Sequence, residues 1–208
     1  MNLGYVISTI IASLVLLSLV ALNSRIVRGS GEQTLYTMAK IQSDMVVDYV
    51  KDDMRSMGYR VDGNAIVYAD ANCIRFLVRF EGDESPTAID WWFNSGADPI
   101  GQNDNIRPLY RRQVTYDSGD DPDVTVGCDF ASDPDAVSIA TGIVEFEFVY
   151  LDDQRQPVTD PQNQLDNIRQ IQLSMIVENM ESYGNRNQYV RSTWRGEITP
   201  FNLNLNMN

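Results

Sequence analysis

The first 24 residues contain no charged side chain, and the stretch from Tyr5 to Leu22, called here the apolar run, is almost entirely apolar. As an α-helix this run would extend about 27 Å, close to the hydrocarbon thickness of a bilayer. A helix that is apolar on all faces must be covered by lipid or by other helices. We therefore expect residues 1–28 to form a membrane or assembly helix. The side chains expected to make its contacts are Tyr5, Ile7, Ile10, Ile11, Leu14, Leu16, Leu17, Leu19, Val20 and Leu22.

A cleaved secretory signal peptide is the alternative interpretation of this segment. It fits poorly, because the first four residues carry no Lys or Arg and no clear small-x-small cleavage site follows the run. The run also contains Ser8, Thr9, Ser13 and Ser18. Their hydroxyls are able to bond back to the helix backbone, and their small size permits close helix–helix approach.

Residues 29–58 continue the helical pattern with one apolar face. Apolar side chains recur mostly every three or four positions at Leu35, Met38, Ile41, Met45, Tyr49 and Met57. Gly58 stands where a C-cap glycine belongs, whereas Gly29-Ser30-Gly31 is a weak point because interior glycines disfavour helix. The pattern predicts one long helix from about residue 3 to 57, either kinked or briefly melted at the glycines, whose apolar face packs on a sheet.

The remaining residues, 59–208, change to the two-residue period of β-strands. Apolar side chains alternate with polar ones near residues 74–80, 144–150 and 171–177, and weaker strand candidates lie at 65–69, 87–93, 109–116 and 189–199. Short turn-rich segments separate them. The predicted fold class is α+β, with a long helix packed on an antiparallel sheet head, and the strand Arg and Glu side chains are expected on solvated outer faces.

Charge and composition exclude several functions. The formal net charge is −13 and the chain has no histidine. An acidic head repels phosphate backbones, so nucleic-acid binding is not expected. The lack of histidine removes the commonest general base and metal ligand, and no nucleophile or phosphate-binding motif is present. We therefore expect no enzymatic activity.

Three further features are candidate sites. Cys73 and Cys128 are the only cysteines, and in an extracytoplasmic head they would form a disulfide; the alternative is two buried thiols. Asp117, Asp121 and Asp123 alternate in an acidic turn that offers oxygen ligands to Ca²⁺, although a solvated turn without a metal is the favoured interpretation and no other cofactor is expected.

Aromatic and terminal segments were assessed in the same way. Trp91-Trp92-Phe93 would present side chains on both faces of a strand, which favours packing over ligand binding. The chain end alternates apolar residues with Asn, at Phe201, Leu203, Leu205 and Met207. This period predicts a last edge strand of the same head, or, as the alternative, a strand added to the sheet of a neighbour.

The order of these segments resembles the type IV pilins and the pseudopilins of type II secretion. Four segments are similar to strands and chain ends of the larger minor pseudopilins and minor pilins: 107–112 (RPLYRR), 142–153 (GIVEFEFVYLDD), 168–177 (IRQIQLSMIV) and 198–205 (ITPFNLNL). That family has a basic leader cut after a glycine, and a glutamate at the fifth mature position. Here Gly4 lacks a basic leader, and the fifth position is Tyr5 or Thr9.

The resemblance implies a structural subunit that is stored in the inner membrane by its N-terminal helix, with an extracytoplasmic head, and then assembled into an extracellular or periplasm-spanning filament. Its partners would be copies of itself, other pilin-like subunits and, before assembly, membrane lipid. The alternative is a single-pass anchored domain that binds a ligand or ion and does not polymerise. Arg25 and Arg28, just after the run, would by the positive-inside tendency favour a cytoplasmic head, which conflicts with the pilin interpretation.

Overall fold

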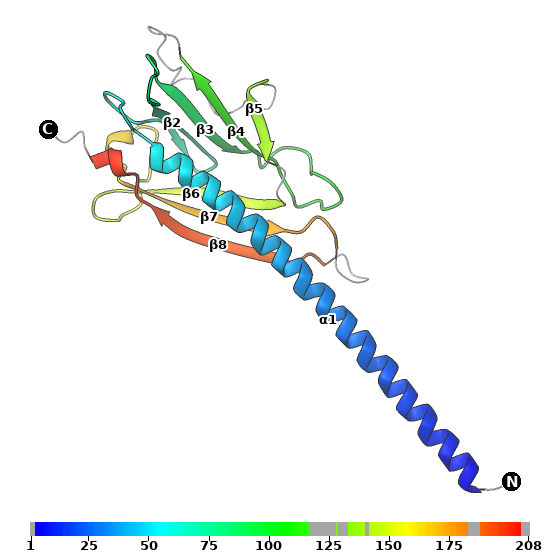
Figure 1. Ribbon diagram of the computed structural model, residues 1–208. Coiled ribbons are helices and arrows are strands. Elements are labelled where there is room, and N and C mark those ends of the chain that lie inside the picture. The colour runs from blue at the N-terminus through cyan, green and yellow to red at the C-terminus, as the bar shows by residue number, and fades with distance from the viewer. Residues whose placement is uncertain (1–2, 117–127, 129–132, 140–141, 183–187, 205–208) are drawn as a thin grey trace.

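The computed structural model describes residues 3–116, 128, 133–139, 142–182 and 188–204. It has one long N-terminal helix packed at its upper end against antiparallel sheets, which confirms the α+β arrangement (Figure 1). Helix α1 extends over Leu3–Ser56. The other elements are β1 (Ile66–Asp70), β2 (Cys73–Val78), β3 (Thr87–Phe93), β4 (Leu109–Thr115), β5 (Ala136–Ile139), β6 (Ile143–Leu151), the 3-10 helix η1 (Leu165–Asn167), β7 (Gln170–Glu178), β8 (Arg191–Ile198) and the 3-10 helix η3 (Phe201–Asn204).

Helix α1 is continuous through the glycines, so the expected kink or melted stretch at Gly29-Ser30-Gly31 is wrong. Each glycine costs about 1 kcal/mol relative to alanine. A break would cost more, because it would leave several backbone N–H and C=O groups without helical partners at each new end. The predicted C-cap is present: Gly58 has φ +73°, and its N–H donates to the carbonyl of Leu77 at 2.8 Å.

The head contains two antiparallel sheets rather than one. Strands β1 to β5 pair in chain order in a five-stranded sheet, and β6, β7 and β8 pair in a three-stranded sheet. The backbone joins the two sheets at their edges, since the N–H of Phe148 donates to the carbonyl of Ala71 at 2.7 Å. Side chains from both sheets and from the upper part of α1 form one main core, in which the rings of Phe93 and Phe146 lie 6.4 Å apart.

Every predicted strand segment contains a strand, but β5 was missed because Ala136–Ile139 is only four residues long and carries little alternation. The expected solvated outer faces hold for Glu145 and Glu147, which are exposed. They do not hold for Arg75 in β2, which is 2% exposed. Its Nε donates to the buried carboxylate of Asp90 in β3 at 2.6 Å, because a charge on a covered sheet face needs a partner.

The chain end also differs from the prediction. Residues 201–204 form the 3-10 helix η3 and not an edge strand. The side-chain amide of Asn202 donates to the carbonyl of Met57 at 3.2 Å, and Leu203 packs against the core. This capping of the last turn of α1 is a tertiary interaction that an alternating sequence pattern does not reveal. Leu205 and Met207 lie outside the described residues.

Candidate assembly surface

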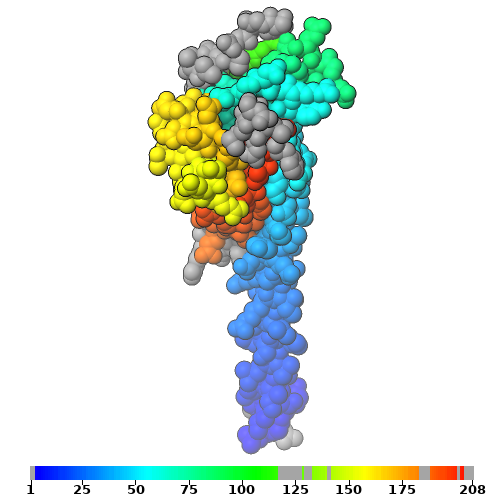
Figure 2. All heavy atoms as spheres, turned by 90° about the vertical axis from the view of Figure 1, so that its left-hand side faces the viewer, coloured from blue at the N-terminus to red at the C-terminus, as the bar shows by residue number. Residues whose placement is uncertain are grey.

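The lower half of α1 extends away from the head and contacts no other part of the described chain (Figures 1 and 2). Its most apolar 18-residue window has a mean hydropathy of 2.5 and is entirely unburied, so the helix is long and apolar enough to cross a membrane. All ten side chains predicted to make assembly or membrane contacts, from Tyr5 to Leu22, are exposed. The surface of this segment is therefore available to lipid or to another protein.

The hydroxyl groups of this helix are satisfied within it. Thr9 donates to the carbonyl of Tyr5 at 2.7 Å, Ser13 to that of Thr9 at 2.8 Å, and Ser18 to that of Leu14 at 2.8 Å. This is the back-bonding expected for Ser and Thr in a helix. Because these donors are already used, the protruding segment presents an effectively apolar surface despite its polar residues.

The upper half of α1 uses a different face for the head than the sequence pattern predicted. The helix face that packs on the sheets is formed by Ala39, Ser43, Val46, Val47, Val50 and Met54, all buried. The predicted contacts Met38, Ile41, Met45 and Tyr49 remain 53%, 53%, 66% and 46% exposed. The sequence has two apolar rows, and the buried row is the one with small and β-branched side chains, because these let the helix approach the sheets closely.

The four exposed side chains Met38, Ile41, Met45 and Tyr49 form what we call the outer stripe. They recur at spacings of three and four residues, so they lie on one side of the helix. The buried row occupies the other side, against the head. The outer stripe is thus an apolar helix surface beside the head, continuing upward from the protruding segment.

Polar contacts hold the helix to the five-stranded sheet beside this stripe. The Asp53 carboxylate accepts hydrogen bonds from Arg111 and from the Trp91 indole Nε1, the latter at 2.8 Å. Burial lowers the pKa of Arg111, but the hydrogen bond and charge of Asp53 outweigh this and raise it, so Arg111 stays protonated. The Arg111 guanidinium lies 5.1 Å from the ring centre of Tyr49, which positions the top of the outer stripe.

A second polar cluster lies at the lower end of the head. Glu178 is 1% exposed and accepts hydrogen bonds from the side-chain amides of Asn103 at 2.9 Å and Asn105 at 3.0 Å, and from Arg191. Burial raises the pKa of Glu178, but these hydrogen bonds and the charge of Arg191 outweigh it and leave the pKa below its ordinary value. The carboxylate is fully engaged and serves to fix β7, β8 and the 94–108 segment together.

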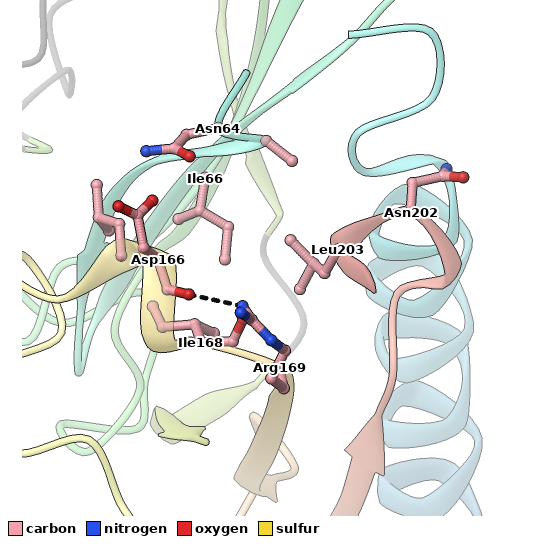
Figure 3. Close-up of a pocket in the computed structure, with 9 residues that line it drawn as sticks. Asn64, Ile66, Asp166, Ile168, Arg169, Asn202 and Leu203 are labelled. Atoms are coloured by element: carbon pink, nitrogen blue, oxygen red, sulfur yellow. Dashed lines mark hydrogen bonds between the residues drawn. The ribbon is translucent and has the colours of Figure 1, made fainter. Parts of the chain in front are cut away.

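A cavity of about 300 Å³ lies beside the upper end of α1, between β1, η1 and η3 (Figure 3). Its labelled lining residues include Asn64, Asp166 and Arg169, and Nη1 of Arg169 donates to the carbonyl of Asp166 at 2.7 Å. The described lining contains no Ser, Cys or Lys, so it offers no nucleophile paired with a base. Its chemistry is that of a polar surface hollow.

The remaining predicted sites have separate outcomes. Cys73 and Cys128 are joined in a disulfide, with their Cα atoms 6.2 Å apart, and the sulfurs lie among Tyr68, Trp92 and Tyr110. Trp91 and Phe93 are buried and Trp92 faces the opposite side of the strand, where it stacks on Tyr110, as expected for packing.

The acidic turn with Asp117, Asp121 and Asp123 falls outside the described residues. Among the residues that are described, no three His, Cys, Asp or Glu side chains are grouped to hold a metal ion. Comparisons with protein-family models, with curated proteins and with solved structures return no match. The physical character of α1 therefore carries the functional argument.

Proposed function

We propose that this protein is a structural subunit of a pilin-like filament, held together by side-by-side packing of its N-terminal helices. The observation that supports this most is the height of the outer stripe. Its first residue, Met38, lies about 24 Å along the helix above Leu22, the end of the apolar run. A bilayer that covers the apolar run has a hydrocarbon core of about 30 Å and therefore does not reach the stripe.

Another helix is the natural cover for both surfaces. Lipid can cover the apolar run but not the outer stripe, whereas a neighbouring subunit covers both. Identical subunits that contact each other through different surfaces make heterologous contacts, and such contacts generate open helical filaments when the ring does not close. Copies of this chain, or other pilin-like subunits, are thus the proposed partners, and the membrane is where the subunit waits before assembly.

The disulfide supports a head outside the cytoplasm, because disulfides persist in oxidising compartments. In this proposal the apolar run crosses the inner membrane, the head faces outward, and the assembled filament is extracellular or spans the periplasm. The protein is then a scaffold without catalytic activity, and its acidic head does not bind nucleic acid.

Negative-stain microscopy of material sheared from cells that make the chain tests this proposal. We expect filaments that contain the protein, and we expect Met45→Asp to abolish them, because a charge would be placed inside the helix contact. The control variant Glu147→Gln changes an exposed residue of β6, far from the stripe, and should leave filaments intact. Recovery of the wild-type chain only as a detergent-extracted monomer would count against the proposal.

A single-pass anchored binding domain is the second candidate, and the cavity in Figure 3 is the observation that favours it. Arg169 is its only lining cation, so a small anionic ligand would be the natural occupant. Such a protein would remain monomeric in the membrane. The same microscopy separates the two functions, since Met45→Asp would then have no effect on the state of assembly.

A further inference from the structure

The outer stripe and the charges on either side of it contain information about how two copies would align. Resting on the proposed filament function, we propose that neighbouring parallel copies are shifted by 24 residues, about 36 Å along the helix axis, and that the pair Arg25 and Arg28 of one copy meets Asp48 and Asp52 of the next. This register requires only residues on the exposed surface of α1.

The first support is the match of apolar surfaces. With this shift, the apolar run of an upper copy lies beside residues 29–46 of a lower copy. Leu14 then lies level with Met38, Leu17 level with Ile41, and Ala21 level with Met45. The last pair places a small side chain opposite the most exposed methionine of the stripe, which lets the helices approach closely.

The second support is charge. Four exposed charged residues, two basic and two acidic, are brought to the same height by the same shift. Arg28 of the upper copy lies level with Asp52, and Arg25 lies level with Tyr49, one residue above Asp48. Arg25 would therefore meet both a carboxylate and an aromatic ring, two groups that attract a guanidinium.

Other registers match less well. A shift of 27 residues brings Arg28 level with Arg55, a like charge, while a shift of 20 residues leaves Arg25 level with the apolar Met45. Like-charge contacts at an interface are a recognised means of rejecting wrong pairings. The charges thus select one register from those that apolar packing alone would permit.

The third support is steric. The head covers α1 from Leu35 to Met54, about 29 Å of helix. A shift of about 36 Å exceeds this length, so the segments of α1 covered by the two heads do not overlap. A shorter shift would bring the two heads to the same height beside packed helices. The register that aligns the charges is therefore also one that leaves room for the heads.

This inference supplies what the missing acidic residue near the start of the helix leaves open. Neither Tyr5 nor Thr9 can form a charge pair with the N-terminal amine of a neighbour. In the proposed register the charge pairing lies instead above the apolar run, in water and not in lipid. Exposed pairs are weak individually and are screened by salt, so assembly should weaken as the ionic strength rises.

Cysteine cross-linking of the full-length protein in assembled filaments tests the register directly. The native cysteines are already joined to each other, so introduced ones report new contacts. Ala21→Cys with Met45→Cys should give covalent oligomers, because a disulfide requires Cα atoms within about 7 Å. The matched control, Ala21→Cys with Met38→Cys, uses the same helix face two turns lower and should not cross-link.

A charge exchange provides the second test. Arg25→Asp should lower the yield of filaments by about three- to tenfold through like-charge repulsion, and adding Asp48→Arg to the same chain should restore it. The melting temperature of the head serves as the folding control for each variant. Filaments whose cross-links appear only with Met38→Cys, or with neither pair, would overturn the register while leaving the filament function intact. A wild-type chain that forms no filaments would overturn both.

Discussion

Asp53 of α1 and Arg111 of β4 form a two-point ion pair: Nε to Oδ2 is 2.7 Å, and Nη2 to Oδ1 is 3.0 Å. The two residues are far apart in the sequence, and the same carboxylate also accepts the Trp91 indole N–H. This one side chain therefore connects the helix with two neighbouring strands of the five-stranded sheet. The joint matters for assembly, because force or packing on the protruding helix reaches the head through the last turns of α1.

Asp53→Ala should destabilise the head by about 2–4 kcal/mol, because it leaves Arg111 and the Trp91 indole N–H without their partner in a mostly buried site. Chemical denaturation of the detergent-solubilised chain would measure the loss. Asp52→Ala is the matched control: its carboxylate is exposed and pairs only with the exposed Arg55, so we expect a change within about 0.5 kcal/mol. Equal effects of the two variants would contradict the proposed role of the joint.

The two faces of α1 predict opposite outcomes for two methionines. Met54→Ala should cost about 2–5 kcal/mol, because Met54 is fully buried in the core. Met45→Ala, on the outer stripe, should change the stability of the monomer by about 0.5 kcal/mol or less. Thermal melting of both variants in detergent measures the difference, and a large loss of monomer stability with Met45→Ala would refute the assignment of the faces.

Gly58 and Gly29 provide a second matched pair. Gly58 has φ +73°, and an added Cβ would lie 2.9 Å from the Cβ of Ala65, so Gly58→Ala should destabilise the head by about 1–3 kcal/mol. Gly29 lies in open helix with no atom near an added Cβ, so Gly29→Ala should stabilise the helix by about 1 kcal/mol. Melting temperatures that shift in the same direction for both would contradict the observed backbone.

Loss of the disulfide should lower stability by about 2–4 kcal/mol, chiefly by releasing a constraint on the unfolded chain. The double variant Cys73→Ala/Cys128→Ala measures this in a denaturant titration. Reducing agent added to the wild type should produce a similar loss and should not affect the double variant. If reduction changes nothing in the wild type, the two cysteines are not paired in solution.

Glu178 predicts a specific dependence of stability on pH. Its pKa in the folded head lies below the ordinary value of 4.5, so the unfolded chain binds its proton more readily. The stabilisation is complete above that ordinary value and is lost as pH falls through the lower folded pKa. Glu178→Gln should therefore flatten the acid side of a stability–pH curve.

The control for this measurement is Glu147→Gln on the exposed face of β6, which should retain the wild-type slope. The pKa of Asp133 is also lowered, mainly by its hydrogen bond with Arg112, so some acid dependence should persist in Glu178→Gln. An unchanged slope after loss of Glu178 would show that its hydrogen bonds with Asn103 and Asn105 do not form in solution.

Patterns that depend only on nearby residues were readable before the structure. The apolar run, the helix end at Gly58 and the main strands follow from periodicity and from glycine conformation. Arg75 was misplaced because alternation marks two faces of a strand but does not say whether the second face is covered. Residues 201–204 were misplaced because their contact with Met57 joins opposite ends of the chain.

The candidate assembly surface shows the same division. The sequence by itself determined that a long helix begins with a segment apolar on all faces, because hydrophobicity over successive turns is a local property. Only the tertiary structure decided which of the two apolar rows above that segment remains exposed. The row of Ala39, Val46 and Val50 approaches the sheets closely, since small and β-branched side chains leave little space there. That choice leaves Met38, Ile41, Met45 and Tyr49 exposed on the other side.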